Sequence, residues 1–138
     1  SKMIKKLLGT SCSLKWREDG ELERLWCVNM THPIARGLGE YIDIPQEEMY
    51  GEPFGIPAPD ELVYIGWFRG GEVLRGGCVF RRGSGKFFYF NPGHETYPTY
   101  KIPAVQKLLV QAAEYVAPQV PVLDGLDCPH VESYSVKD

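Results

Sequence analysis

The imbalance between strand-like and helical segments limits the folds open to this chain. Only one complete amphipathic helix is evident: from Pro103 to about Val116, apolar residues recur every three or four positions and form one continuous stripe. About five or six other segments alternate polar and apolar residues or form short apolar runs, as strands do. Because a mixed sheet needs cover on both faces, we expect an incomplete fold or cover supplied by a partner chain.

Four segments are predicted to be strands of the sheet. Residues 62–68 form a continuous apolar run, which is typical of a buried central strand. Residues 76–81 and 86–91 are expected to pair around a glycine-rich turn. Residues 40–44 alternate in polarity, and Pro45 is expected to end that strand.

Two turns and a loop are also predicted. Glu18-Asp19-Gly20 lies between the strand-like residues 11–17 and 21–28, and Asp-Gly in such a place is a strong hairpin signal. His32, in a Thr-His-Pro turn, is expected to be a structural cap rather than a ligand. Residues 46–60 contain three prolines and two glycines, which predicts a surface loop. Loops of this length inside compact domains are usually functional.

Composition excludes several classes of protein. The net charge is −3 and the 15 basic residues are scattered, which argues against a nucleic-acid-binding protein. No run approaches the roughly 20 apolar residues of a membrane-spanning helix. The four cysteines form no C-x-x-C pair, so we expect reduced thiols and a cytoplasmic protein. Residues 118–138 are rich in proline and lack periodicity, which predicts an irregular or disordered tail.

The loop at residues 91–100 is the strongest candidate for a functional site. It follows a predicted strand and precedes the helix, where open α/β sheets bind ligands. His94 can act as an acid, a base or a metal ligand near neutral pH, and Glu95 can orient it or exchange protons with it. Tyr97 and Tyr100 add two phenols. The alternative is that His94 and Glu95 only cap the connection while the tyrosines pack over it.

Two other clusters could contribute. Residues 46–52 hold three carboxylates, of which Glu48, with Tyr50 nearby, is favoured for a functional role. Adjacent acids on a surface loop are more often simply solvated. Trp16 offers a flat apolar face and Arg17 a fixed fork of donors, a combination that suits a sugar or a carboxylate. Cross-strand pairing of Trp16 is an equally good explanation.

Several of these segments together resemble the ThuA-like family, whose members are associated with the use of trehalose and related carbohydrates. The matching stretches, in family order, are residues 9–18, 31–38, 46–52 and 90–100. The family fold is similar to the class I glutamine amidotransferase domain. The resemblance therefore implies a flavodoxin-like α/β domain with a mixed sheet, of which residues 1–117 would be the C-terminal part, without the N-terminal strands and helices.

The resemblance also implies a function: acid–base or hydrolytic chemistry on a keto-disaccharide or a related sugar by a hydrolase, lyase or isomerase. The catalytic residues would be His94, Glu95 and Glu48. The residues expected to bind the substrate are Trp16, Arg17, Tyr50, Tyr97 and Tyr100. A divalent metal such as zinc, held by His94 and a carboxylate such as Glu48, is an open alternative.

Other readings of the same residues stay open. Amidotransferases complete a Cys-His-Glu triad with a His-x-Glu pair, whereas His94 and Glu95 are adjacent here and no cysteine elbow is present. Glutamine hydrolysis is therefore not supported. The chain could instead be a non-catalytic sugar-binding or regulatory module, or an interaction domain. The expected partners are a small carbohydrate and either a second copy of the chain or the absent N-terminal half, with no nucleic acid and no membrane.

Overall fold

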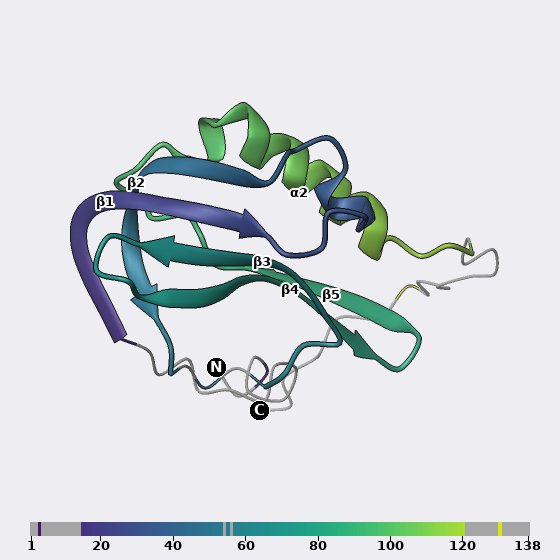
Figure 1. The fold of residues 1–138 in the computed structure, drawn as a ribbon. Coiled ribbons are helices and arrows are strands. Elements are labelled where there is room, and N and C mark those ends of the chain that lie inside the picture. The colour runs from purple at the N-terminus through teal and green to yellow at the C-terminus, as the bar shows by residue number, and fades with distance from the viewer. Residues whose placement is uncertain (1–2, 4–14, 54, 56, 121–129, 131–138) are drawn as a thin grey trace, which may run out of the picture.

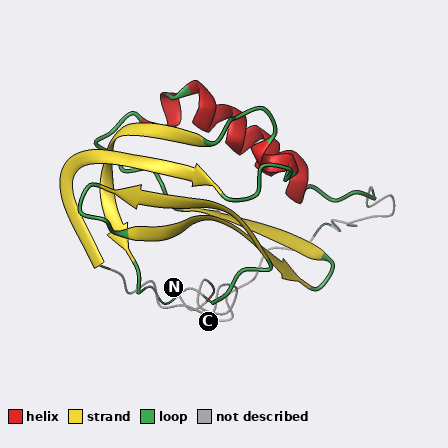
Figure 2. Cartoon of the chain, in the orientation of Figure 1, coloured by secondary structure: helices red, strands yellow, loops and turns green. Residues whose placement is uncertain are grey.

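A curled antiparallel sheet with one helix across it makes up the described part of the chain (Figures 1 and 2). This computed structural model describes residues 3, 15–53, 55, 57–120 and 130. The strands follow the order β2-β1-β3-β4-β5. The elements are β1 (Lys15–Cys27), η1 (Pro33–Ala35), β2 (Tyr41–Gly51), β3 (Glu61–Phe68), β4 (Val73–Arg82), β5 (Gly85–Phe90), η2 (Thr99–Lys101) and α2 (Pro103–Val116). The helix and the central strand β3 confirm their predictions from the sequence.

The main hydrophobic core lies between α2, η1 and the sheet. Three residues of the predicted helical stripe, Val105, Leu108 and Ala112, are buried there. They pack with residues of four strands and η1: Leu25, Ile34, Ile42, Ile44, Val63 and Val79. A side-chain contact also fastens the helix to η1, because the Gln111 amide donates to the Ile34 carbonyl at 2.7 Å.

The hairpin predicted at Glu18-Asp19-Gly20 is wrong, because β1 runs through these residues as one strand. Between Arg17 and Glu21 the register with β2 shifts, so the extra residues form a β-bulge. Gly20 has a φ of +62°, a conformation that a bulge and a tight hairpin turn both require. The bulge accompanies the bend of β1 in Figure 1 but does not reverse the strand.

The strand predicted to end at Pro45 in fact continues to Gly51, so the predicted loop over residues 46–60 is wrong in its first part. β2 lies at the edge of the sheet, where a proline can face away from the neighbouring strand without losing a ladder hydrogen bond. As a result, Glu47 and Glu48 are buried rather than solvated.

The expected combination of a sheet with a helix is confirmed, but the sheet is not mixed. All four strand pairings among the described residues are antiparallel. A flavodoxin-like fold needs parallel strands joined by crossover helices, so this part of the chain does not confirm that assignment. The helix expected at residues 2–8 and most of the expected tail lie outside the described residues.

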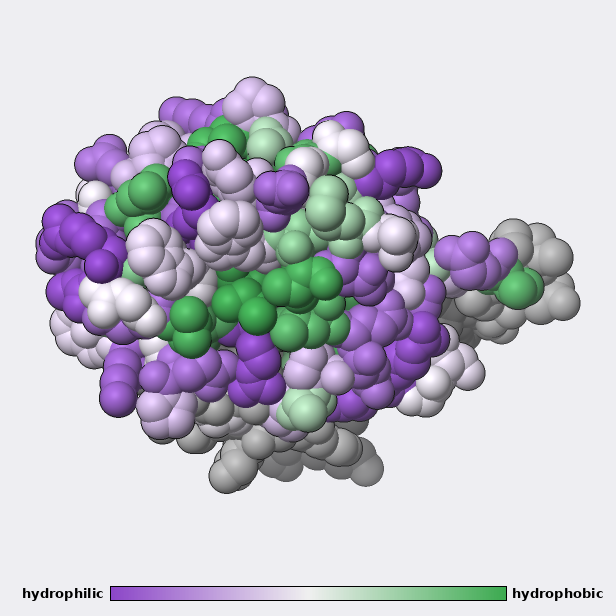
Figure 3. Space-filling model, viewed as in Figure 1, coloured by the Kyte–Doolittle hydropathy of each residue, from purple (hydrophilic) through white to green (hydrophobic). Residues whose placement is uncertain are grey.

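The face of the sheet seen in Figure 3 carries a gathering of apolar side chains over its central strands, with polar side chains around it. On the sheet, Trp26 packs edge to face with Tyr41, with ring centroids 5.1 Å apart. The Arg24 guanidinium lies 4.0 Å from the centre of the Tyr41 ring and pairs with both oxygens of Asp43. No helix in the described ranges is long and apolar enough to cross a membrane.

Candidate functional site

The loop that carries His94 is tied to β2 by one buried side chain, Glu47. Only 1% of Glu47 is exposed. Its Oε2 accepts hydrogen bonds from the Gly93 amide and from the Thr99 hydroxyl, both at 2.8 Å. Its Oε1 accepts from the amide of Glu48 at 3.1 Å. These contacts bring the loop that follows β5 against the second half of β2, which is where Glu48 lies.

His94 presents one ring nitrogen to three carboxylates. Its Nδ1 accepts from the Thr96 amide at 3.2 Å, so the proton of the neutral ring is on Nε2. The Nε2 atom lies 3.5 Å from Glu95 and 3.8 Å from both Glu18 and Glu48. These distances are longer than those of a well-formed N–H···O hydrogen bond.

Glu48 is the best shielded of the three carboxylates. Its side chain is 11% exposed, whereas that of Glu95 is 88% exposed. Tyr50 donates a hydrogen bond to Glu48 Oε2. Burial, together with that bond, raises the pKa of Tyr50, so its hydroxyl stays a donor. The Glu48 side chain is therefore held in one orientation, whereas the Glu95 carboxylate adds negative charge at the solvent-exposed edge of the cluster.

Trp16 lies beside this cluster. It pairs directly with Tyr50 across β1 and β2, and residues opposite each other in an antiparallel pair share one face of the sheet. Trp16 is 64% exposed, so its indole face is open to a ligand. The structure thus places the predicted residues Trp16, Tyr50, Glu48 and His94 in one region.

Tyr97 and Tyr100 frame the same loop. The Tyr97 ring lies 5.4 Å from the His94 ring and rests against Gly20, where a Cβ would come within 3.0 Å of the Tyr97 hydroxyl. Burial and then the charges of nearby carboxylates raise the pKa of Tyr97. Tyr100 donates to the Pro92 carbonyl at 3.0 Å and lies so close to Gly93 that a Cβ there would overlap its hydroxyl.

Arg17 is paired with two carboxylates of the fold. Its guanidinium pairs with Glu72 at 2.7 Å and with Glu21 at 2.6 Å, and so joins β1 to the turn between β3 and β4. The hydrogen bond from Arg17 lowers the pKa of Glu72 to about 2. Because these carboxylates occupy the guanidinium, Arg17 braces the bend of β1 in this structure.

His32 is the structural cap that the sequence predicts. Its Nδ1 accepts from the Ile34 amide at 3.2 Å at the start of η1. Its Nε2 lies 2.7 Å from Glu61, which also accepts from the Tyr115 hydroxyl at 2.7 Å. Both ring nitrogens are therefore engaged within the fold, and the ring ties η1 to β3 and α2.

The sequence analysis did not single out Glu18, Glu47 or Glu23. Glu18 belongs to the bulge that was expected to be a hairpin turn, and Glu47 to the strand segment that was expected to be a loop. Glu23 is fully buried, and neither of its carboxyl oxygens has a hydrogen-bond partner. A Cβ at Gly66 would overlap this carboxyl group, so glycine on the neighbouring strand makes room for it. Only the strand register could have shown these positions.

The zinc alternative gains no support from the described residues. Among them, no three histidine, cysteine, aspartate or glutamate side chains are grouped in a way that could hold a metal ion. We therefore derive no chemical step through a metal.

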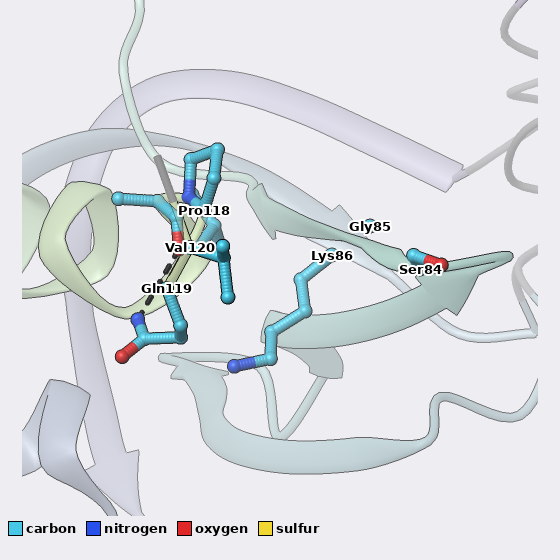
Figure 4. Close-up of a pocket in the computed structure, with 8 residues that line it drawn as sticks. Ser84, Gly85, Lys86, Pro118, Gln119 and Val120 are labelled. Carbon is cyan, nitrogen blue, oxygen red and sulfur yellow. Dashed lines mark hydrogen bonds between the residues drawn. The ribbon is translucent and has the colours of Figure 1, made fainter. Parts of the chain in front are cut away.

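A cavity of about 340 Å³ lies elsewhere in the molecule (Figure 4). It is lined by Ser84 of the β4–β5 turn, by Gly85 and Lys86 at the start of β5, and by residues 116–120 at the end of α2. Lys86 reaches from this lining to the Tyr115 carbonyl at 3.2 Å. None of the predicted site residues lines this cavity.

A protein-family model matches most of the chain. The model of the ThuA family, described as "Trehalose utilisation", matches residues 1–116 and so spans the whole candidate site. A comparison with curated proteins gave no match.

Proposed function

Because the chain belongs to the ThuA (trehalose utilisation) family, we propose that it acts on a disaccharide or a related sugar, including keto-sugars, by acid–base chemistry. One observation carries the proposal. His94 Nε2 lies 3.8 Å from the shielded carboxylate of Glu48, which accepts a hydrogen bond from Tyr50, the cross-strand partner of the exposed Trp16.

Each residue has a chemical role in this proposal. Glu48, oriented by the Tyr50 hydroxyl, takes a proton from a sugar hydroxyl. His94 donates a hydrogen bond from Nε2–H to the sugar oxygen that gains negative charge, since the Thr96 amide occupies Nδ1. Glu48 then returns the proton it has taken to the leaving or accepting oxygen. Trp16 packs against the apolar C–H face of the sugar ring. Glu18 and Glu95 place two further carboxylates within 3.8 Å of Nε2.

The finer assignments go beyond what the described residues show. We propose that residues 1–117 are part of a flavodoxin-like domain of the class I glutamine amidotransferase type, without glutaminase activity. We also propose that the protein works in the cytoplasm and associates with itself or with further parts of such a domain. The family match supports the domain assignment, whereas the cytoplasmic location is inferred from the unpaired cysteines of the sequence.

A turnover assay tests the proposed chemistry. The purified chain is incubated with trehalose and with its 3-keto derivative, and products are separated by chromatography. We expect Glu48→Gln and His94→Ala to lower turnover by about 10²-fold or more. The control is Glu114→Gln, an equal change of charge at an exposed position on α2.

The outcomes separate the alternatives. Turnover that survives both substitutions at the wild-type rate would contradict the proposed roles of Glu48 and His94. Sugar binding that these substitutions weaken, without turnover by any variant, would favour the non-catalytic sugar-binding module instead.

A further inference from the structure

We propose that Glu47 is the positioning residue of the candidate site. It holds the backbone of β2 at Glu48 and the backbone of the loop before His94, so that His94 faces Glu48. This inference deepens the proposed function and rests on it for its catalytic meaning. The geometric part stands on hydrogen bonds alone and can be tested without any sugar.

The contacts of Glu47 involve both halves of the site. One oxygen accepts from the amide of Gly93, the residue directly before His94. The other oxygen accepts from the amide of Glu48 itself. A single carboxylate therefore fixes the backbone at both proposed acid–base residues, and a shift of this carboxylate would change the distance between them.

Thr99 supplies a second hold on the same loop. Its hydroxyl donates to the same oxygen as Gly93, at 2.8 Å, and the residue is almost completely buried. The loop from Gly93 to Thr99 is thus tied down at both ends, with His94 between the two ties. Such a closed connection limits the positions that the imidazole can reach.

The chemistry of these bonds requires a carboxylate. Three donors point at the two oxygens, and a carboxylate has acceptor sites for all of them. A glutamine has the same shape but only one acceptor oxygen, and its NH₂ group would face a donor. Glu47→Gln therefore loses at least one of the ties while it keeps the volume of the side chain.

Glu23 provides a matched control. It is as deeply buried as Glu47 and is carried by the neighbouring strand, but neither of its oxygens has a hydrogen-bond partner. The same substitution, Glu23→Gln, therefore removes a buried carboxyl group without removing a tie to the loop.

The experiment is amide hydrogen exchange and NMR on the free protein. In Glu47→Gln we expect the amide of Gly93 or of Glu48 to exchange at least tenfold faster. We also expect weaker contacts between the ring protons of His94 and Tyr97, while the amides of β3 stay protected. Thr99→Val should loosen the same loop, and Thr99→Ser, which keeps the hydroxyl, should restore it. Glu23→Gln should leave the loop unchanged.

Two results would overturn the inference. One is wild-type exchange at Gly93 and Glu48, with wild-type His94–Tyr97 contacts, in both Glu47→Gln and Thr99→Val. The other is equal loosening of the loop by Glu23→Gln, which would indicate a general loss of stability. Absence of turnover in the wild-type protein would count against the proposed function and leave these readouts intact.

Discussion

At the scale of single residues, Glu23 shows how the fold changes the chemistry of one group. Burial, and then the negative charge of Glu47, raise the pKa of Glu23 well above its usual range. Burying a carboxyl group without hydrogen-bond partners costs far less free energy when the group is neutral than when it is charged. The native protein therefore holds this proton at pH values where the unfolded chain, with an ordinary pKa of about 4.3, has lost it.

This difference predicts how stability depends on pH. The contribution of Glu23 is fully present below the pKa of the unfolded state and is lost as the pH rises towards the folded pKa. The slope for this one proton is at most about 1.4 kcal/mol per pH unit. Glu23→Gln should remove that slope and be more stable than wild type at neutral pH, as urea unfolding across pH 4–8 would measure. A slope as steep in the variant as in the wild type would contradict the prediction.

The site residues differ in how far the sequence could predict them. His94, Glu48, Tyr50 and Trp16 were found because their side chains suit sugar chemistry, and the structure brings them together. Arg17 was chosen on the same grounds, but its guanidinium pairs with Glu21 and Glu72. Glu72 is far away in the sequence, and Glu21 follows a turn signal that did not show on which side of Arg17 it would lie. Such contacts depend on strand register and on the β1 bulge.

At the scale of elements, α2 was predictable and the bend of β1 was not. Apolar residues that recur every 3.6 positions over the 14 residues of α2 indicate an amphipathic helix and no other element. By contrast, the positive φ of Gly20 serves a hairpin turn and a bulge equally well. Pro45 usually signals the end of a strand, but it is tolerated in β2 because that strand is at the sheet edge. A single sequence does not reveal which strand is the edge.

The stripe of α2 gives a prediction at the same scale. Leu108 is fully buried against the sheet, whereas Val110, two positions along, is 58% exposed. Leu108→Ala should lower the free energy of unfolding by about 2–5 kcal/mol. Val110→Ala should change it by no more than about 0.5 kcal/mol. Urea unfolding of both variants measures the difference, and equal effects would mean that α2 does not pack as described.

At the scale of the whole molecule, the charge around the site predicts its selectivity. The carboxylates of Glu18, Glu48 and Glu95 surround His94 Nε2, and Arg17 is neutralised by its own partners. A sugar phosphate brings roughly two further negative charges at neutral pH. We therefore expect trehalose 6-phosphate to bind at least tenfold more weakly than trehalose in calorimetric titrations.

Salt provides the control for this charge effect. The preference for trehalose should shrink as the ionic strength rises, because salt screens repulsion between exposed charges. Equal or tighter binding of the phosphorylated sugar at low salt would contradict the charge argument while leaving sugar binding itself intact.

The most informative first measurement is an NMR titration of the ¹⁵N-labelled chain with trehalose. We predict saturable shifts of the Trp16 indole N–H and of the amides from Gly93 to Tyr97, and a loss of these shifts in Glu48→Gln. Shifts confined to the lining of the cavity between the β4–β5 turn and the end of α2, or no shifts at millimolar sugar, would contradict a sugar site at His94 and Glu48.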